Sequence, residues 1–224
     1  MALAINIPPL TSGDRLSRRE FERRYEAMPE HFKAELIEGV VYVASPVRYA
    51  SHGKPHTYII TWLGTYCATT PGVEVADNAT VRMDPFNEPQ PDVLLRLEPA
   101  VGGRSGITPD DYIEGAPELI VEIAASSAAY DLREKKTVYQ RNGVREYLVW
   151  QVYEQRLDWF YLVEDEYEPL LPDANGIIRS RIFPGLHLDM PALLAGDLAQ
   201  VLAVVQAGIQ STEHAAFVAR LQIS

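Results

Sequence analysis

The sequence predicts a mixed α/β fold, with a β-sheet, helices between groups of strands, and a helical arm at the C-terminal end. Three observations predict it. Helical and strand patterns alternate along the chain from an early helix to a helical end. The run 118–124 is apolar enough to be a central, buried strand. The 224 residues also suffice for one large domain with a sizeable core.

The N-terminal part predicts a helix, a hairpin and a second helix. The first helix is expected at 17–28, where Ser17 with Glu20 three positions later forms a capping-box signature. The hairpin is expected at 34–46, because two short apolar runs flank a turn that contains glycine. The second helix, at 56–70, carries apolar residues at helical spacing and ends at a Pro-Gly pair, so it is expected to be largely buried.

The middle of the chain alternates strands with loops. Residues 73–83 predict a pair of strands, and residues 90–99 a short strand that begins at a proline. Residues 101–117 are rich in glycine and proline and predict a loop. After the strand at 118–124, a helix is expected at 131–142, where an Asn-Gly pair ends it.

The C-terminal part begins with strands and ends with helices. Residues 145–152 and 156–163 predict a hairpin, and residues 167–190 predict short strands around an Asn-Gly turn. Leucines and valines then recur at helical intervals. They predict a helical arm over 191–224, with a second helix at 212–222.

Composition limits the class of protein. Hydrophobic residues make up 47% and charged residues 23%, as in ordinary globular proteins. No apolar run is long enough for a membrane span, so no membrane association is expected. The opening segment MALAINIPPL lacks the basic start and long apolar run of a secretory signal. Cys67 is the single cysteine, which excludes an intrachain disulfide, favours a cytoplasmic setting and predicts a core or half-buried thiol.

The net charge of −11 argues against a broad nucleic-acid-binding surface, because phosphate contacts need positive charge. Two groups of basic residues nevertheless provide local positive charge, and they lie within 15–24 and within 133–145. Such patches can still attract phosphate. For the first group, a solvated helix face is an equally good interpretation.

A carboxylate lies in the middle of the most apolar strand. Side chains of a strand alternate between two faces, so Glu122 shares a face with Ile120 and Ala124. Burying a lone carboxylate costs on the order of several kcal/mol unless it is paired or binds a metal. We therefore expect a partner for Glu122, and an ion pair with one of the arginines would satisfy this need.

The helix after this strand offers another partner. Asp131 is a natural N-cap residue, with Glu134 three positions later to complete a capping box. Helical phase places Lys135 at the centre of the apolar face and Lys136 to one side of it. Because the helix directly follows the strand, Lys135 can pack back against Glu122. Snorkelling of Lys135 towards solvent is the alternative.

A second acid has a similar position. Asp92 follows a proline at the start of the predicted strand 90–99, although a Pro-Asp pair alone is common in turns. Together with Glu122, it can hold Mg²⁺ or Mn²⁺, hard ions that prefer oxygen ligands. Such an ion polarises a phosphodiester and lowers the pKa of a bound water. Lys135 would then position the nucleophile or stabilise the charge that develops during the reaction.

Three segments in this order, PDVLL, PELIVEIAASS and YDLREKKTVYQRNGVREYLVW, resemble the Uma-two family of restriction endonucleases. The resemblance also reaches AELIEGVVYVASP and the SHG that follows, and covers roughly residues 20–190. That family belongs to a nuclease superfamily whose signature is Pro-Asp, then an acid, any residue and a lysine. The resemblance implies a restriction endonuclease-like core, with a central mixed β-sheet flanked by helices, as a nuclease domain over 1–190.

The resemblance also implies roles for individual residues. Asp92 matches the acid of the Pro-Asp pair, Glu122 matches the second acid, and Lys135 matches the lysine. The ordinary spacing of the superfamily places the lysine where this chain has Ala124. A lysine on the following helix is known in the superfamily and is typical of this family, so the departure leaves the site complete.

Other positions match less central parts of the pattern. Glu35 matches an early acid of the family, which implies a further metal ligand or a base. His52 matches a histidine after the first hairpin, and His56 nearby is an alternative for that role. The family often has Ser-Pro-Ser where this chain has Ala-Ser-Ser at 125–127, which implies a changed turn.

The function implied by the resemblance is metal-dependent hydrolysis of DNA phosphodiester bonds by an endonuclease. Mg²⁺ or Mn²⁺ would be held by Asp92, Glu122 and Glu35, and the partner would be double-stranded DNA. The extension 191–224 is longer than the resemblance requires and suggests a dimer arm, since a homodimer suits the cutting of two strands.

Two other classes of function compete with this one. The first is a catalytically inactive member of the same fold with a binding or assembly role, which the negative charge favours. The second is a small-molecule enzyme that uses Glu122 and Lys135 as an acid–base pair, although the sequence has no cofactor-binding motif.

Overall fold

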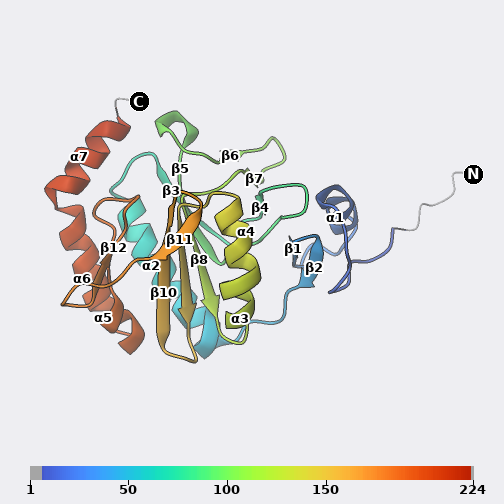
Figure 1. Ribbon diagram of the computed structural model, residues 1–224, viewed down its shortest axis with the longest axis horizontal. Coiled ribbons are helices and arrows are strands. Elements are labelled where there is room, and N and C mark those ends of the chain that lie inside the picture. Colours follow the sequence, from blue (N-terminus) through green and yellow to red (C-terminus); the bar gives the residue numbers. More distant parts are fainter. Residues whose placement is uncertain (1–6, 223–224) are drawn as a thin grey trace, which may run out of the picture.

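The computed structural model describes residues 7–222, so residues 1–6 of the opening segment lie outside the described part. The main sheet has six strands, which are β3 (Val73–Asp77), β5 (Val93–Leu97), β8 (Leu119–Ala124), β9 (Glu146–Gln151), β10 (Arg156–Val163) and β11 (Glu166–Pro169). Their order is β11-β10-β9-β8-β5-β3 (Figure 1). Within this sheet, β8 and β9 pair in parallel and the other neighbours pair antiparallel, so the central sheet is mixed, as the resemblance implied.

Helices cover both faces of this sheet. On one face lie α2 (Lys54–Cys67), α5 (Met190–Ala195), α6 (Leu198–Ile209) and α7 (Thr212–Leu221), and on the other lie α3 (Ala128–Tyr130) and α4 (Lys136–Arg141). The first helix, α1 (Arg18–Tyr25), packs against the first hairpin instead. Figure 1 shows α5–α7 at one end of the molecule, and α1 with the first hairpin at the other. The predicted α/β class is therefore confirmed.

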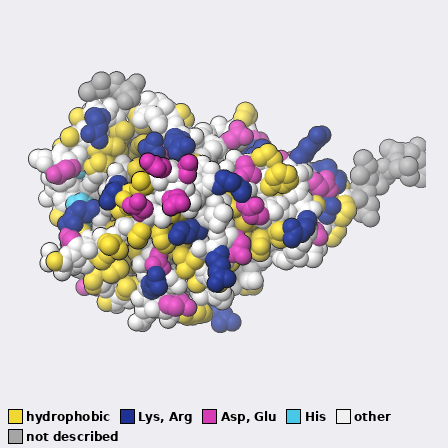
Figure 2. Space-filling view, in the orientation of Figure 1, with side chains coloured by type: hydrophobic (Ala, Val, Ile, Leu, Met, Phe, Trp, Pro, Cys, Tyr) yellow, Lys and Arg dark blue, Asp and Glu magenta, His cyan; other side chains and the backbone are white. Residues whose placement is uncertain are grey.

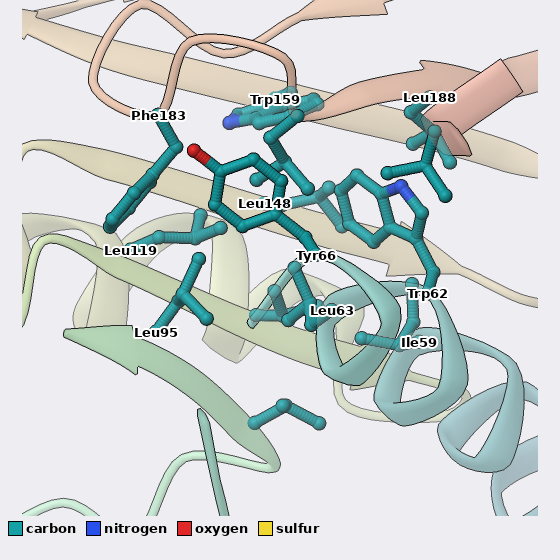
Figure 3. Packing of buried hydrophobic residues seen from close by; sticks show 14 of the residues in the cluster. Ile59, Trp62, Leu63, Tyr66, Leu95, Leu119, Leu148, Trp159, Phe183 and Leu188 are labelled. Atoms are coloured by element: carbon teal, nitrogen blue, oxygen red, sulfur yellow. The ribbon is translucent and has the colours of Figure 1, made fainter. Parts of the chain in front are cut away.

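The alternation of side chains along β8 divides the core into two parts. Leu119, Val121 and Ile123 belong to one apolar cluster, together with α2 and the C-terminal helices. Figure 3 shows this cluster between α2 and the sheet, with Trp62 near Trp159. Ile120, on the opposite face, belongs to a second cluster with the apolar residues of α4. Glu122 therefore faces α4, as the strand periodicity predicted.

Several short strands lie outside the central sheet. They are β1 (Ala34–Ile37), β2 (Val40–Val43), β4 (Val81–Arg82), β6 (Gly106–Ile107), β7 (Ile113–Glu114), β12 (Ile177–Arg179) and β13 (His187–Asp189). β1 and β2 form the predicted hairpin, whose turn residues Glu38 and Gly39 both have positive φ. The hairpin is a separate two-stranded sheet, and a bridge from Leu36 to Glu88 attaches it to the segment before β5.

Three local predictions were wrong. The predicted capping box does not form: the side chain of Ser17 makes no capping hydrogen bond, and the carboxylate of Glu20 accepts from Arg23 and Arg24 on α1. The strands within 73–83 do not pair with each other; β3 pairs with β5, and β4 pairs with β7. The Gly- and Pro-rich segment 101–117, predicted as a loop, contributes β6 and β7.

The helix after β8 begins earlier than predicted. It starts at Ala128 with α3, and a single π-helical turn, Asp131–Lys135, leads into α4. Asp131 is consequently a buried residue inside the helix, and its prediction as the N-cap was wrong. Lys135, in the π-helical turn, and Tyr139, on α4, are both buried.

The C-terminal helices pack onto the rest of the chain. The helix predicted at 212–222 within the C-terminal arm is α7. Buried residues of α5, α6 and α7 belong to the same apolar cluster as those of α2. Cys67, at the end of α2, is half-buried, as predicted. Within residues 7–222, no helix is both long and apolar enough to cross a membrane.

Candidate active site

Glu122 is buried in the middle of β8, and its carboxylate is bound by two side chains from the following helix. The amine of Lys135 lies 2.9 Å from Oε1, and the hydroxyl of Tyr139 donates to the same oxygen at 2.7 Å. Helical phase predicted Lys135 as the partner, and the structure bears this out. The side chain of Lys135 is 6% exposed, which excludes snorkelling, and Glu122 pairs with this lysine and not with an arginine.

Lys135 also reaches a second carboxylate, which comes from the hairpin. Its amine lies 3.0 Å from Oε2 of Glu35 on β1. The hydroxyl of Tyr130 donates to Oε1 of Glu35 at 3.3 Å, and the backbone N–H of Gln90 donates to Oε2 at 3.2 Å. The hairpin therefore brings Glu35 to the same amine that binds Glu122.

Burial and charge act in opposite directions on this pair. Burial raises the pKa of Glu122 well above its usual value, although Lys135 lowers it. Burial lowers the pKa of Lys135, but Glu122, Glu35 and Asp131 outweigh this and hold it well above its usual value. A raised pKa of Glu122 favours its neutral acid, and a raised pKa of Lys135 favours its charged amine. The amine is charged, because two carboxylates lie within 3.0 Å of it.

Asp92 lies beside Glu122 at the edge of the sheet. It directly precedes β5, and Val93 of β5 pairs with Val121 of β8, so the register places Asp92 next to Glu122. The N–H of Ile123 donates to Oδ2 of Asp92 at 2.7 Å, which fixes the carboxylate against β8. The two acids therefore come from neighbouring strands, and these strands are antiparallel.

His52 contacts Asp92 from the π-helical turn Tyr49–Gly53, which precedes α2. Its Nε2 lies 3.0 Å from Oδ1 of Asp92. The hydrogen bond to Asp92 raises the pKa of His52. Burial raises the pKa of Asp92, but the bond and charge of His52, with the N–H of Ile123, hold it below its usual value. Asp92 is accordingly an ionised carboxylate near neutral pH.

His56, the alternative to His52 in the sequence analysis, lies beside it, with ring centroids 5.4 Å apart. Nε2 of His56 is 3.0 Å from the backbone oxygen of Asp92 and 3.0 Å from Oδ1 of Asp77. A backbone carbonyl only accepts, so this nitrogen carries a proton. Of the two histidines, His52 is the one that touches the carboxylate of Asp92.

These groups border an open cleft of about 530 Å³. Glu35, His52, Asp92 and Lys135 line it, and the end of β2 with the segment after it forms part of its wall. Glu122 is not part of the lining and lies buried next to Lys135. All five predicted site residues are therefore brought together, four at the surface of the cleft and one beneath it.

The donor set fits a hard divalent cation. Within residues 7–222, no group of three or more His, Cys, Asp or Glu side chains is arranged so that it could hold a metal ion. Mg²⁺, however, is usually held by one or two carboxylates, with water and substrate phosphate completing its shell. Asp92 and Glu122 supply two such carboxylates. Both described hydrogen bonds of the Glu122 side chain go to Oε1, and none is described to Oε2.

Part of the first basic group identified in the sequence is neutralised by acids on the same helix. On α1, Arg18 pairs with Glu22, and Arg23 and Arg24 both pair with Glu20. This supports the interpretation of that group as a solvated helix face. On the face seen in Figure 2, basic and acidic side chains are interspersed.

The sequence missed some of the residues that shape this site. Tyr139 was placed on the apolar face of the helix, yet its hydroxyl binds Glu122. Its spacing, four residues after Lys135, was the available signal. Tyr130 and Gln90, which hold Glu35, had no signal, because their contact depends on how the hairpin docks.

Comparisons with known proteins show the family and the fold. The model of a family named Uma2, described as “Putative restriction endonuclease”, matches residues 18–191. A solved structure, described as “a putative nuclease belonging to DUF820” from Anabaena variabilis, is similar with a TM-score of 0.56 and 13% sequence identity. The similarity covers 78% of this chain and 97% of that chain, and at this identity it shows the fold alone. A search of curated proteins gives no match.

Proposed function

The chain belongs to the Uma2 family, “Putative restriction endonuclease”, and on this premise we propose that it is a metal-dependent endodeoxyribonuclease. One observation carries the proposal. Two carboxylates on adjacent strands, Asp92 and Glu122, lie beside an amine at an open cleft. Buried, like-charged carboxylates with a lysine among them are typical of sites that perform chemistry.

In this proposal, Asp92 and Glu122 hold Mg²⁺ or Mn²⁺, and Glu35 is a further ligand or a base. A cation bound there polarises the scissile phosphodiester and lowers the pKa of a water molecule. Asp92 is ionised and already fixed by the N–H of Ile123, so little reorganisation is needed before it binds a ligand.

Lys135 supplies a fixed positive charge. Its pKa lies well above the usual value, so it is protonated and cannot serve as a general base at neutral pH. A protonated amine at the wall of the cleft can instead stabilise the negative charge that develops on the phosphate. His52, bound to Asp92, orients that carboxylate in this proposal.

The substrate in this proposal is double-stranded DNA, bound through its backbone at the cleft. The cation and Lys135 would supply local positive charge, which offsets the overall charge of −11. The division into a nuclease domain at 1–190 and an extension at 191–224, and dimerisation through that extension, stay predictions. So does a cytoplasmic setting, which the single cysteine supports.

The test is cleavage of supercoiled plasmid DNA with Mg²⁺ or Mn²⁺. We expect nicked or linear products from the wild type, and their loss in Glu122→Gln. Glu134→Gln is the matched control, because Glu134 is an exposed acid on the same helix. We expect this control to cleave like the wild type.

A catalytically inactive member of the fold is the competing proposal, and the negative charge of the chain is the observation that favours it. An inactive wild type with all tested divalent ions, together with absence of metal binding by calorimetry, would decide for this alternative.

A further inference from the structure

We propose that Tyr139 is a positioning residue of the metal site. With Lys135, it occupies one oxygen of Glu122, and so leaves the other oxygen to bind the cation. This inference rests on the proposed function and adds a residue to it that the nuclease signature does not contain.

Both donors approach the same carboxylate oxygen. The hydroxyl of Tyr139 lies 2.7 Å and the amine of Lys135 lies 2.9 Å from Oε1 of Glu122. The two residues are four positions apart on one helix, so their side chains project from the same face. A carboxylate oxygen has two lone pairs, and these two donors use both.

The orientation of the Tyr139 ring is held by its surroundings. The side chain is fully buried, and its ring packs edge-on against Tyr147 with centroids 5.0 Å apart. The hydroxyl of Tyr147 donates to the backbone oxygen of Asp131 at 3.0 Å, which ties β9 to the helix. Because the phenol cannot turn away, the carboxylate of Glu122 is fixed with Oε1 towards the helix.

Tyr139 differs in this contact from the other two fully buried tyrosines of the described residues. The hydroxyls of Tyr66 and Tyr147 donate to backbone carbonyls, and so join segments of the chain. The hydroxyl of Tyr139 instead donates to a buried acid, which also pairs with Lys135.

The experiment measures Mn²⁺ binding to the full chain by calorimetry in the wild type, Tyr139→Phe and Tyr147→Phe. Tyr139→Phe keeps the ring and removes only the hydroxyl. Loss of such an outer-shell partner typically weakens metal affinity about 10- to 100-fold. We expect about 10-fold weaker binding in Tyr139→Phe and a change of less than about twofold in Tyr147→Phe.

A second readout separates positioning from stability. In Tyr139→Phe, the Mn²⁺ concentration for half-maximal plasmid cleavage should rise by the same factor, and saturating Mn²⁺ should restore most of the rate. Equal Mn²⁺ affinity in wild type and Tyr139→Phe would overturn the inference. So would equal weakening in both variants, or a Tyr139→Phe chain without a native circular dichroism spectrum. A wild type that binds no Mn²⁺ would instead refute the proposed function itself.

Discussion

Replacement of Lys135 by methionine tests the buried charge network most sharply. Methionine keeps the length and apolar stem of lysine and removes its charge. The amine lies 2.9 Å from Glu122 and 3.0 Å from Glu35. Without it, the carboxylate of Glu122 stays buried near Asp92, with a hydroxyl as its remaining partner.

The expected cost follows from this geometry. Removing one partner of a buried ion pair typically costs about 3–5 kcal/mol of unfolding free energy. Protonation of Glu122 limits this cost, because burial already raises its pKa and the loss of Lys135 raises it further. A carboxyl group with a raised pKa in the folded state is favourable at low pH and becomes unfavourable as pH rises. We therefore expect a loss of about 3 kcal/mol at pH 8 and a smaller loss at pH 5.5.

We would measure the unfolding free energy by urea denaturation at both pH values, for the wild type, Lys135→Met and Lys136→Met. Lys136 is the matched control, because it lies to one side of the helix with its amine 3.6 Å from the centre of the Phe160 ring. Its loss should cost about 1 kcal/mol or less at either pH. A Lys135→Met variant as stable as the wild type at pH 8, or a deficit that grows towards pH 5.5, would refute this reasoning.

Two further predictions concern the fold around the site. Burial raises the pKa of Glu146 to about 7, so the folded chain holds a proton between about pH 4.5 and 7 that the unfolded chain has released. Urea unfolding should show that the unfolding free energy falls by about 3 kcal/mol as pH rises through this window. Glu146→Gln should remove this pH dependence, and an unchanged pH dependence in the variant would contradict the prediction. Leu193→Ala on α5 should lower the unfolding free energy by about 2–5 kcal/mol, because Leu193 is fully buried. The exposed Leu171→Ala should change it by less than about 0.5 kcal/mol, and equal effects would show that the C-terminal helices are not part of the core.

Much of the site could be predicted because it depends on local periodicity. The alternation of β8 placed Glu122 on the face towards the next helix, and the helical phase placed Lys135 opposite it. Both periods hold within one strand–helix unit, so short-range geometry suffices. The contact between Lys135 and Glu122 was predicted correctly although the predicted start of the helix was wrong, since the helix begins at Ala128 and not at Asp131.

The remaining contacts depend on segments that are distant along the chain. Glu35 reaches Lys135 because the hairpin docks beside the sheet, and no local pattern predicts that docking. The pairing of β3 with β5, and of β4 with β7, likewise joins strands that are not consecutive. Tyr139 was missed for another reason, because a tyrosine fits an apolar face as well as it fits a hydrogen-bonded one.

In the proposed function, Asp92 and Glu122 hold the divalent cation that DNA cleavage by this protein requires. The most direct measurement is the initial rate of plasmid cleavage in Mn²⁺ for the wild type, Glu122→Gln and Glu134→Gln. We expect that the wild type cleaves DNA and that cleavage stops when the metal is chelated. We also expect a rate at least about 100-fold lower in Glu122→Gln than in Glu134→Gln. Equal rates in the two variants, or cleavage that persists after chelation, would contradict it.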